Sequence, residues 1–343
     1  MNNTDSATHS QAVAPTPSEN MLEHWKSLWP SFHEVLQARQ VLSRHLFKTP
    51  LLSYPGLNRW IGTELLIKHE NTHQTGAFKV RGGLYLLSQL SPEELQRGVI
   101  TYSTGNHGQS IAYAAQQHGI KATIVMPEEA NPLKVQAMQN LGAEVLLVGH
   151  RFDDAREHAE HLSRTHGYRL IQAANEPRIV AGVGTIALEM LEEAPDLDVI
   201  MVAVGGGSSA AGTCLAVQAM KPSCQVIAIQ AEGSPASFLS WKNQSLLSAP
   251  NETFAEGLAT GAGYGLTQSI MQAHLYDFVL VSDEDIRQAM RRYLTDAHTL
   301  TEGAGAASLA GAYSIREQLQ GKKVGVILSG GNSSLEHLKS LLN

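Results

Sequence analysis

The segment KHENTHQTGAFKVRGG, residues 68–83, places Lys79 in an otherwise apolar and glycine-rich turn that leads into a predicted helix. A lysine amine attacks a carbonyl carbon efficiently only when burial or a neighbouring cation lowers its pKa, and we expect Phe78 and Arg81 to supply these two influences. The alternative is an ordinary lysine at a helix start, with a buried apolar stem and a solvated amine. The rest of the chain decides between these interpretations.

Short runs rich in valine and isoleucine alternate with stretches of helical spacing along the whole chain. This rhythm is typical of an α/β protein. Strands are predicted near residues 99–103, 122–126, 144–148, 199–204, 225–231, 278–282 and 324–328. A helix is predicted after Asn131, because Pro132 suits the first helical position and Gly142 follows the last turn.

Three glycine-containing loops follow predicted strands, at Gly105, Gly205 and Gly330. Ligands of open α/β sheets bind beyond the carboxyl ends of the strands, so we expect the three loops to face one cleft. The second loop consists of Gly205, Gly206, Gly207, Ser208 and Ser209. Successive amides without a Cβ in the way wrap a phosphate at a helix start, where the helix dipole also favours negative charge.

Two alternatives exist for this glycine loop. It matches a dinucleotide-binding pattern through Gly205, Gly207 and Ala210, with Glu232 after the next strand as a ribose ligand. That interpretation leaves Lys79 without a role. A plain strand-to-helix turn is the second alternative, although three glycines and two serines exceed what a turn needs.

Composition excludes several classes of function. The 343 residues, 43% of them hydrophobic, suffice for two lobes that share a cleft. A net charge of −7 without a basic block argues against a nucleic-acid or membrane partner. Cys214 and Cys224 lack metal-ligand spacing and are expected to be free thiols in a reducing compartment. Residues 1–20 lack a signal peptide and are predicted to be a disordered tail, which favours a cytoplasmic protein.

Taken together, the motifs resemble the serine/threonine dehydratase and serine racemase family, which are pyridoxal-phosphate enzymes of the tryptophan-synthase type. The resemblance covers nearly the whole chain after about residue 30, with the motifs in the family's order. The motifs lie at residues 48–52, 68–83, 103–109, 205–209, 302–305 and 329–332.

The resemblance implies an α/β fold with two open, mainly parallel twisted sheets flanked by helices. Pyridoxal 5′-phosphate is the implied cofactor, in the cleft between a large domain of residues 21–88 and 171–343 and a small domain of residues 89–170. The implied partners are a small-molecule amino-acid substrate and a second copy of the chain in a homodimer.

The same resemblance implies roles for single residues. Lys79, beside Phe78, holds the resting cofactor and then acts as general base, while residues 205–209 bind the phosphate. Ser329 hydrogen-bonds the pyridine nitrogen. The loop that grips the substrate carboxylate consists of Ser103, Thr104, Gly105, Asn106 and His107, and Asn106 also reaches the phenolic oxygen of the cofactor.

Plainer interpretations exist for some of these residues. Ser329 is alternatively the N-cap of a helix, although Ser333 or Ser334 is better placed for that role. His107 is more often a structural histidine than a proton carrier. Arg156 lies where racemising relatives have a substrate-contacting arginine, and a solvated helix face explains it equally well.

The chain departs from the family pattern at two places. Racemising relatives have a second serine, a catalytic acid and base, where this chain has Thr104, which argues against a two-base racemase. Relatives activated by a divalent cation have an aspartate shortly after the position of Glu232, and residues 233–238 contain none. No metal site is therefore expected, since a hard cation needs several oxygen ligands.

These observations predict a dehydratase that converts a β-hydroxy amino acid of the serine or threonine type to a 2-oxo acid and ammonia. A racemase and a β-replacement synthase are alternatives on the same scaffold, although the synthases normally have threonine where this chain has His107. A non-catalytic ligand-binding protein would not need a reactive lysine. Only eleven residues follow Asn332, so no C-terminal regulatory domain is expected. The glycine-rich loop 257–265 leaves room for a larger β-substituent.

Overall fold

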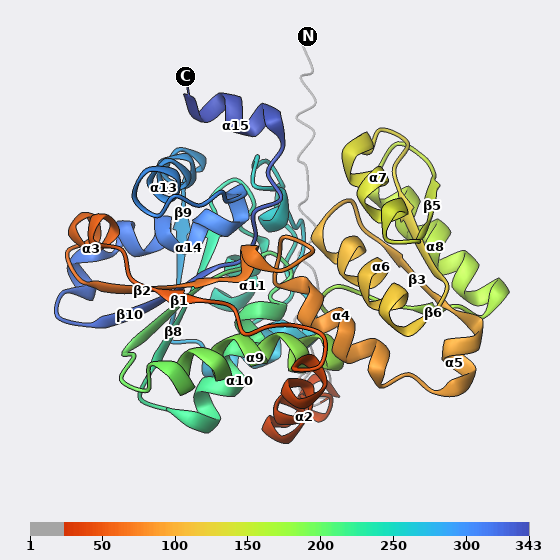
Figure 1. Ribbon diagram of the computed structural model, residues 1–343, viewed down its shortest axis with the longest axis horizontal. Helices are drawn as coiled ribbons and strands as arrows, with labels where there is room; N and C mark the ends of the chain where they lie inside the picture. Colours follow the sequence, from red (N-terminus) through yellow and green to blue (C-terminus); the bar gives the residue numbers. More distant parts are fainter. Residues whose placement is uncertain (1–23, 343) are drawn as a thin grey trace, which may run out of the picture.

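The computed structural model describes residues 24–342, which form two sheets flanked by helices (Figure 1). The large sheet has the strand order β1-β2-β10-β7-β8-β9, and the small sheet has the order β5-β4-β3-β6. All neighbouring strands are parallel except β1 and β2. The predicted α/β fold with two mainly parallel sheets is confirmed, while the tail predicted over residues 1–20 lies outside the described residues.

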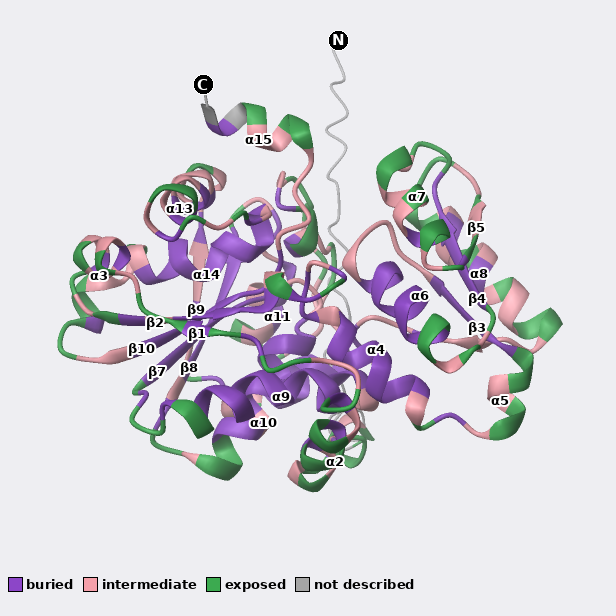
Figure 2. Ribbon diagram, viewed as in Figure 1, coloured by how far each residue is buried: buried purple, intermediate pink, exposed green. Residues whose placement is uncertain are grey.

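The large sheet takes its strands from both ends of the described chain. They are β1 (Leu51–Leu52), β2 (Glu64–His69), β7 (Val199–Ala203), β8 (Gln225–Ala231), β9 (Asp277–Val281) and β10 (Lys323–Leu328). Neighbouring side chains on a strand point to opposite faces, so Val199 and Met201 join one hydrophobic core and Ile200 and Val202 join the other. Both faces of the large sheet are covered by other parts of the chain, so the residues of its central strands are buried (Figure 2).

Helices from distant parts of the chain cover the two faces of the large sheet (Figure 1). The first face carries α3 (Pro55–Ile61), α13 (Asp283–Asp296) and α14 (Gly303–Ser314). The second carries α9 (Pro177–Glu193), α10 (Ser208–Met220), α11 (Ala236–Lys242) and α12 (Gly265–His274), with α2 (Phe32–Leu42) packed on α9. The last helix is α15 (Leu335–Leu342), and short 3-10 turns are η1 (Glu70–Thr72), η2 (Glu256–Leu258) and η3 (Arg316–Leu319).

The small sheet comes from one continuous stretch of chain. Its strands are β3 (Val99–Tyr102), β4 (Ala122–Met126), β5 (Glu144–Leu147) and β6 (Arg169–Leu170). The accompanying helices are α4 (Lys79–Ser88), α5 (Pro92–Arg97), α6 (Asn106–His118), α7 (Pro132–Asn140) and α8 (Phe152–His166). Helix α4 packs against both α6 and α9, so it links the helices of the two sheets.

The local predictions agree closely with the structure. All seven predicted strands are present, with ends that differ by at most about one residue. The Asn131 side chain accepts a hydrogen bond from the Leu133 amide, and Pro132 is the first helical residue of α7, as predicted. Cys214 and Cys224 are buried free thiols. The six-residue strand β2 and the two-residue strands β1 and β6 were not predicted.

Candidate active site

Lys79 is the first residue of α4, and its amine reaches the start of α10. The Lys79 Nζ donates a hydrogen bond of 3.0 Å to Ser208 Oγ and lies 5.0 Å from the centroid of the Phe78 ring. Burial lowers the pKa of Lys79 from 10.5 to about 8, because a charged amine is poorly solvated inside the protein. A larger fraction of the amine is therefore neutral and nucleophilic near neutral pH.

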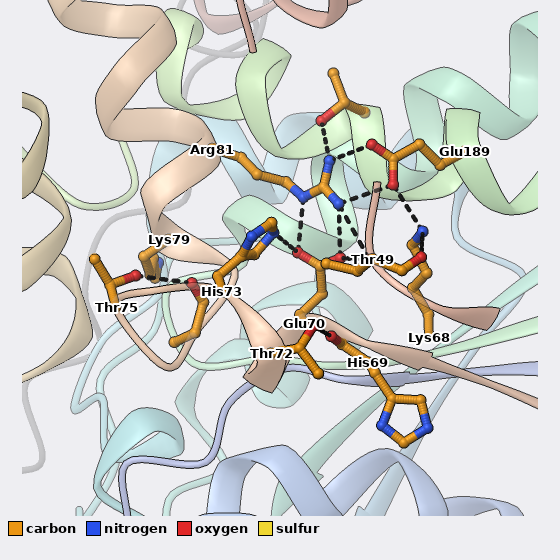
Figure 3. A network of polar contacts seen from close by, with 12 residues as sticks. Thr49, Lys68, His69, Glu70, Thr72, His73, Thr75, Lys79, Arg81 and Glu189 are labelled. Atoms are coloured by element: carbon orange, nitrogen blue, oxygen red, sulfur yellow. Dashed lines mark hydrogen bonds and ion pairs between the residues drawn. The ribbon is translucent and has the colours of Figure 1, made fainter. Parts of the chain in front are cut away.

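Arg81 does not influence this amine in the way predicted from the sequence. Its guanidinium donates two hydrogen bonds to Glu70, of 2.7 and 2.8 Å, and two to Glu189, of 2.6 and 2.9 Å (Figure 3). The carboxylates of Glu70 and Glu189 thus neutralise its positive charge. The pKa of Lys79 is lowered by burial alone, so the expected contribution of a neighbouring cation is wrong.

The Arg81 pairs belong to a larger buried network that joins β2, η1, α4 and α9. Lys68 Nζ donates to Glu189 Oε2 at 2.7 Å and to the carbonyl of Thr49 at 2.8 Å. Burial by itself raises the pKa of Glu70, but Arg81 and His73 outweigh it and hold that pKa well below its usual range. Two cations and two carboxylates therefore balance one another where almost no solvent reaches them.

The carbonyl groups of the glycine loop before α10 accept hydrogen bonds from side chains of neighbouring helices. Ser237 Oγ donates to the Gly205 carbonyl at 2.9 Å, and Thr267 Oγ1 donates to the Gly206 carbonyl at 2.7 Å. Gly207 has a φ of 88°, a left-handed conformation that side chains other than glycine rarely adopt. These contacts stabilise the conformation of the loop.

The amides of this loop are free to bind an anion. Within residues 24–342, the amides of Gly205, Gly206 and Gly207 donate no hydrogen bond to another group. They precede a helix of 13 residues whose first residue, Ser208, contacts the Lys79 amine. Free amides at a helix start bind phosphate, so this site suits a ligand that has a phosphate group close to a group that reacts with an amine.

The end of β10 lies directly beside the lysine turn. The Phe78 amide donates to the Ser329 carbonyl at 3.0 Å, and Ala77 pairs with Gly330 in an isolated antiparallel bridge. Ser329 is a buried residue, and its hydroxyl oxygen is not among the fully enclosed unpartnered atoms of the described residues. A hydroxyl that still has some access and no protein partner is available to a ligand.

The loop between β3 and α6 approaches the same place from the side of the small sheet. Asn106 Nδ2 donates to Glu302 Oε1 at 2.6 Å, and Asn106 Oδ1 accepts from Asn332 Nδ2 at 2.7 Å. Ser103 Oγ accepts from the Gly105 amide at 3.3 Å. The three predicted glycine loops thus meet around Lys79, and the cleft expected between them stays a prediction.

His107 is buried one residue beyond Asn106. Burial, together with the charge of Lys79, lowers the pKa of His107 to about 3. The imidazole is therefore neutral at working pH and is a poor proton acceptor, which agrees with a structural role. Thr104 remains partly exposed at the start of this loop.

The structure also places Arg156 and the loop 257–265. Arg156 forms an ion pair of 3.3 Å with Asp153 on the partly exposed side of α8, so its contact with substrate stays a prediction. Loop 257–265 packs on the glycine loop, because a Cβ added to Gly205 would overlap the Gly257 carbonyl. The ring of Tyr264, in the same loop, lies 3.5 Å from the position that a Cβ added to Gly206 would take. In residues 24–342, no group of three or more His, Cys, Asp or Glu side chains is arranged to hold a metal ion.

No helix in the described part of the chain is both long and apolar enough to cross a bilayer.

The sequence interpretation assigned no role to two residues that the structure places at this centre. Glu302 and Asn332 both contact Asn106, and Asn332 also donates to the Thr75 carbonyl at 2.8 Å. Both residues lie in motifs that were already visible, at residues 302–305 and 329–332. Their positions in the motifs were the only available signal, since their partners are distant in the sequence.

Pyridoxal phosphate carries the two groups that this site suits, an aldehyde for the amine of Lys79 and a phosphate for the free amides. Fold and site together define a pyridoxal-phosphate enzyme. Residues 42–330 match the family model described as "Pyridoxal-phosphate dependent enzyme", and the chain belongs to this family. The predicted family and cofactor are therefore confirmed, and the dinucleotide alternative is set aside.

Known relatives cover most of the chain. It is 35% identical over 314 residues to the L-threonine ammonia-lyase of Thermotoga maritima. The matched region covers 91% of this chain and 78% of the relative. It is 34% identical to the L-threo-3-hydroxyaspartate ammonia-lyase of Saccharomyces cerevisiae, over 92% of this chain and 97% of the relative. Among solved structures, maize serine racemase has a TM-score of 0.87 at 29% identity. The superposition covers 91% of this chain and 97% of the maize chain.

Proposed function

We propose that this protein is an ammonia-lyase that converts a β-hydroxy amino acid of the serine or threonine type to a 2-oxo acid and ammonia. The observation that carries the proposal is the hydrogen bond between the partly buried Lys79 amine and Ser208 at the start of α10. It supports a reactive amine beside the phosphate site that we propose for residues 205–209. Relatives that are themselves named ammonia-lyases, at 35% and 34% identity, support the same type of reaction.

The proposed roles follow from the chemistry that each group offers. Pyridoxal phosphate, when bound, supplies an electron sink for the negative charge that develops at Cα of the amino acid. Lys79 would hold the cofactor, and its Nζ would accept the Cα proton, for which a pKa of about 8 is well suited. Residues 205–209 hold the phosphate with their amides, and Phe78 packs beside the lysine.

Two further groups orient the reacting molecules. The loop formed by residues 103–107 binds the substrate carboxylate and so fixes the direction of the Cα proton. Asn106 would hold the phenolic oxygen of the cofactor. The hydroxyl of Ser329 would hydrogen-bond the pyridine nitrogen, and a neutral hydroxyl would not keep that nitrogen protonated as a carboxylate would. The electron sink is therefore weaker, which favours rapid elimination over reactions that need a long-lived carbanion.

The broader organisation is part of the same proposal. The large domain consists of residues 21–88 and 171–343, and the small domain of residues 89–170, which contains the whole small sheet. We propose a cytoplasmic homodimer, in accord with the free thiols Cys214 and Cys224.

A panel of β-hydroxy amino acids tests the proposal, including serine, threonine, 3-hydroxyaspartate and phenylserine. Formation of 2-oxo acid and ammonia is expected with at least one of them. Borohydride should link the cofactor permanently to a peptide that contains Lys79, and Lys79→Ala should lose both the attached cofactor and turnover. A protein that takes up no pyridoxal phosphate, or that releases D-amino acid faster than 2-oxo acid, would contradict the proposal.

A further inference from the structure

Four residues from distant parts of the chain form a directed chain of hydrogen bonds beside Lys79. Asn332 Nδ2 donates to the Thr75 carbonyl at 2.8 Å and to Asn106 Oδ1 at 2.7 Å. Asn106 Nδ2 then donates to Glu302 Oε1 at 2.6 Å. Thr75 precedes the lysine turn, Asn332 follows β10, Asn106 starts α6 and Glu302 precedes α14.

The direction of this chain is set at its first member. A backbone carbonyl only accepts, so Asn332 must turn its NH₂ group toward Thr75. The same NH₂ group also faces Asn106, which must therefore present its carbonyl oxygen to Asn332. The Asn106 NH₂ group is then directed at Glu302, the one member of the chain that can gain or lose a proton.

Glu302 is held firmly against its neighbours. Its amide donates to the Gly330 carbonyl at 3.1 Å, and a Cβ added to Gly330 would overlap the Glu302 carboxylate. Its carboxylate thus packs on the backbone of the glycine turn after β10, while its hydrogen bond reaches across to α6 of the small sheet. The contact between Asn106 and Glu302 therefore joins the two sides of the site.

We propose that Glu302 is a positioning residue that holds the Asn106 amide in one orientation toward the cofactor, and that its protonation state sets how firmly this amide is held. The inference rests on the proposed function, which assigns Asn106 to the phenolic oxygen of the cofactor. An amide N–H bonds more strongly to a carboxylate than to a neutral carboxyl, so loss of the proton tightens the hold. The second hydrogen of the Asn106 NH₂ group is left for the cofactor.

The ionisable groups around Glu302 allow its ionisation to be shifted in both directions. Lys134 on α7, Glu256 on η2 and His337 on α15 line the same pocket as Glu302. Burial raises the pKa of Glu302 to about 7, the Asn106 hydrogen bond and Lys134 lower it, and Glu256 raises it. Lys134 and Glu256 also pair with each other, so one residue of the pair can be removed at a time.

The first experiment follows the absorption band of the bound cofactor in the holoenzyme without substrate, from about pH 5 to about pH 9. The wild type should show a step with a midpoint near 7. Glu302→Gln keeps an acceptor oxygen and loses the charge, so the step should disappear. Lys134→Gln should move the midpoint to higher pH and Glu256→Gln to lower pH. A purely structural role would not produce shifts of opposite sign.

Asn332→Asp tests the direction of the chain. It removes the NH₂ group that sets the orientation of Asn106, so cofactor affinity should fall at least tenfold. The matched control is Asn71→Asp, the same chemical change at an asparagine that bonds to Thr299 and Leu300 instead. This control should lose much less affinity, and equal losses in both variants would overturn the proposal.

A second readout does not need the cofactor. In the apoprotein, the ¹⁵N signal of the Asn106 side-chain amide, assigned by its loss in Asn106→Ala, should titrate near pH 7 and stop titrating in Glu302→Gln. Titration that persists in Glu302→Gln would overturn the inference. A wild type that binds no pyridoxal phosphate but shows the ¹⁵N step would instead contradict the proposed function, while the hold of Glu302 on Asn106 would stand.

Discussion

Arg81 and Glu70 form a two-point ion pair in the interior of the protein, with Nε to Oε2 at 2.7 Å and Nη2 to Oε1 at 2.8 Å. The desolvation of two charges is costly, and such a pair is stable only with good geometry and further hydrogen bonds. Glu189 and Thr49 supply these bonds (Figure 3). Because Arg81 lies on the first turn of α4, two residues after Lys79, the pair also fixes where that helix begins.

Substitutions of Arg81 should therefore separate the contribution of its charge to stability from the contribution of its planar geometry. Arg81→Lys keeps the charge and loses the planar fork, which should cost about 1–3 kcal/mol of unfolding free energy. Arg81→Met leaves the Glu70 and Glu189 carboxylates with only Lys68 and His73 as nearby partners, and should cost about 3–5 kcal/mol. Urea unfolding of the two apoproteins measures the difference. A methionine variant as stable as the lysine variant would show that the network does not depend on the charge of Arg81.

The partly buried amine of Lys79 should make the apoprotein less stable below pH about 8 than it would otherwise be. The folded pKa lies below the ordinary value of 10.5, so below about 8 the charged amine must be buried on folding, and above 10.5 it is neutral in both states. Lys79→Met should therefore stabilise the apoprotein at pH 7 by up to about 3 kcal/mol. The gain should shrink steadily as the pH rises from 8 toward 10.5.

Thermal or urea unfolding of both apoproteins at several pH values measures this effect. Lys79→Arg is the control, because it keeps a buried charge and should give no such gain. A gain that stays constant with pH would mean that lost packing, and not the charge of the amine, separates the two proteins.

Gly206→Asp should weaken cofactor binding at least tenfold, which corresponds to about 1.4 kcal/mol. The change puts a carboxylate where free amides are expected to meet a phosphate, and the new Cβ lies 3.0 Å from the Cβ of Ala174. Fluorescence titration of the apoprotein with pyridoxal phosphate measures the affinity. Gly261→Asp adds the same charge at an exposed glycine and should bind normally. Equal affinities in the two variants would favour the plain-turn interpretation of the loop.

Thr104→Ser should raise the ratio of D-amino acid to 2-oxo acid roughly tenfold or more, the scale of one general acid or base. The change keeps the hydroxyl and removes the methyl group of the threonine, which gives the serine that the family resemblance implies for racemising enzymes at this position. Chiral chromatography of recovered substrate, alongside an assay for 2-oxo acid, measures the ratio. Thr101→Ser is a matched control, since the Thr101 hydroxyl bonds the Ile171 carbonyl instead. An unchanged ratio in Thr104→Ser would remove this threonine as the reason for preferring elimination.

The sequence by itself determined the features that depend on neighbouring residues. The alternation of apolar strands and helices predicted the α/β fold, and Asn131 with Pro132 predicted the start of α7. Lys79 and the glycine loops were visible as motifs, because a reactive lysine and a phosphate site need particular residue types at close spacing. The strands β1 and β6 were missed because they have two residues each, too few for a recognisable pattern.

Only the tertiary structure decided which partners these residues have. Arg81 was expected to lower the pKa of Lys79, but it binds Glu189, which lies 108 residues away, and Glu70, the first residue of η1. Asn106 likewise meets Glu302 across 196 residues. Local sequence sets which way a side chain leaves its helix or strand, whereas the charge it meets is set by how separate helices and strands pack. For this reason the reactive lysine was predictable, and the residues that hold and orient its surroundings were not.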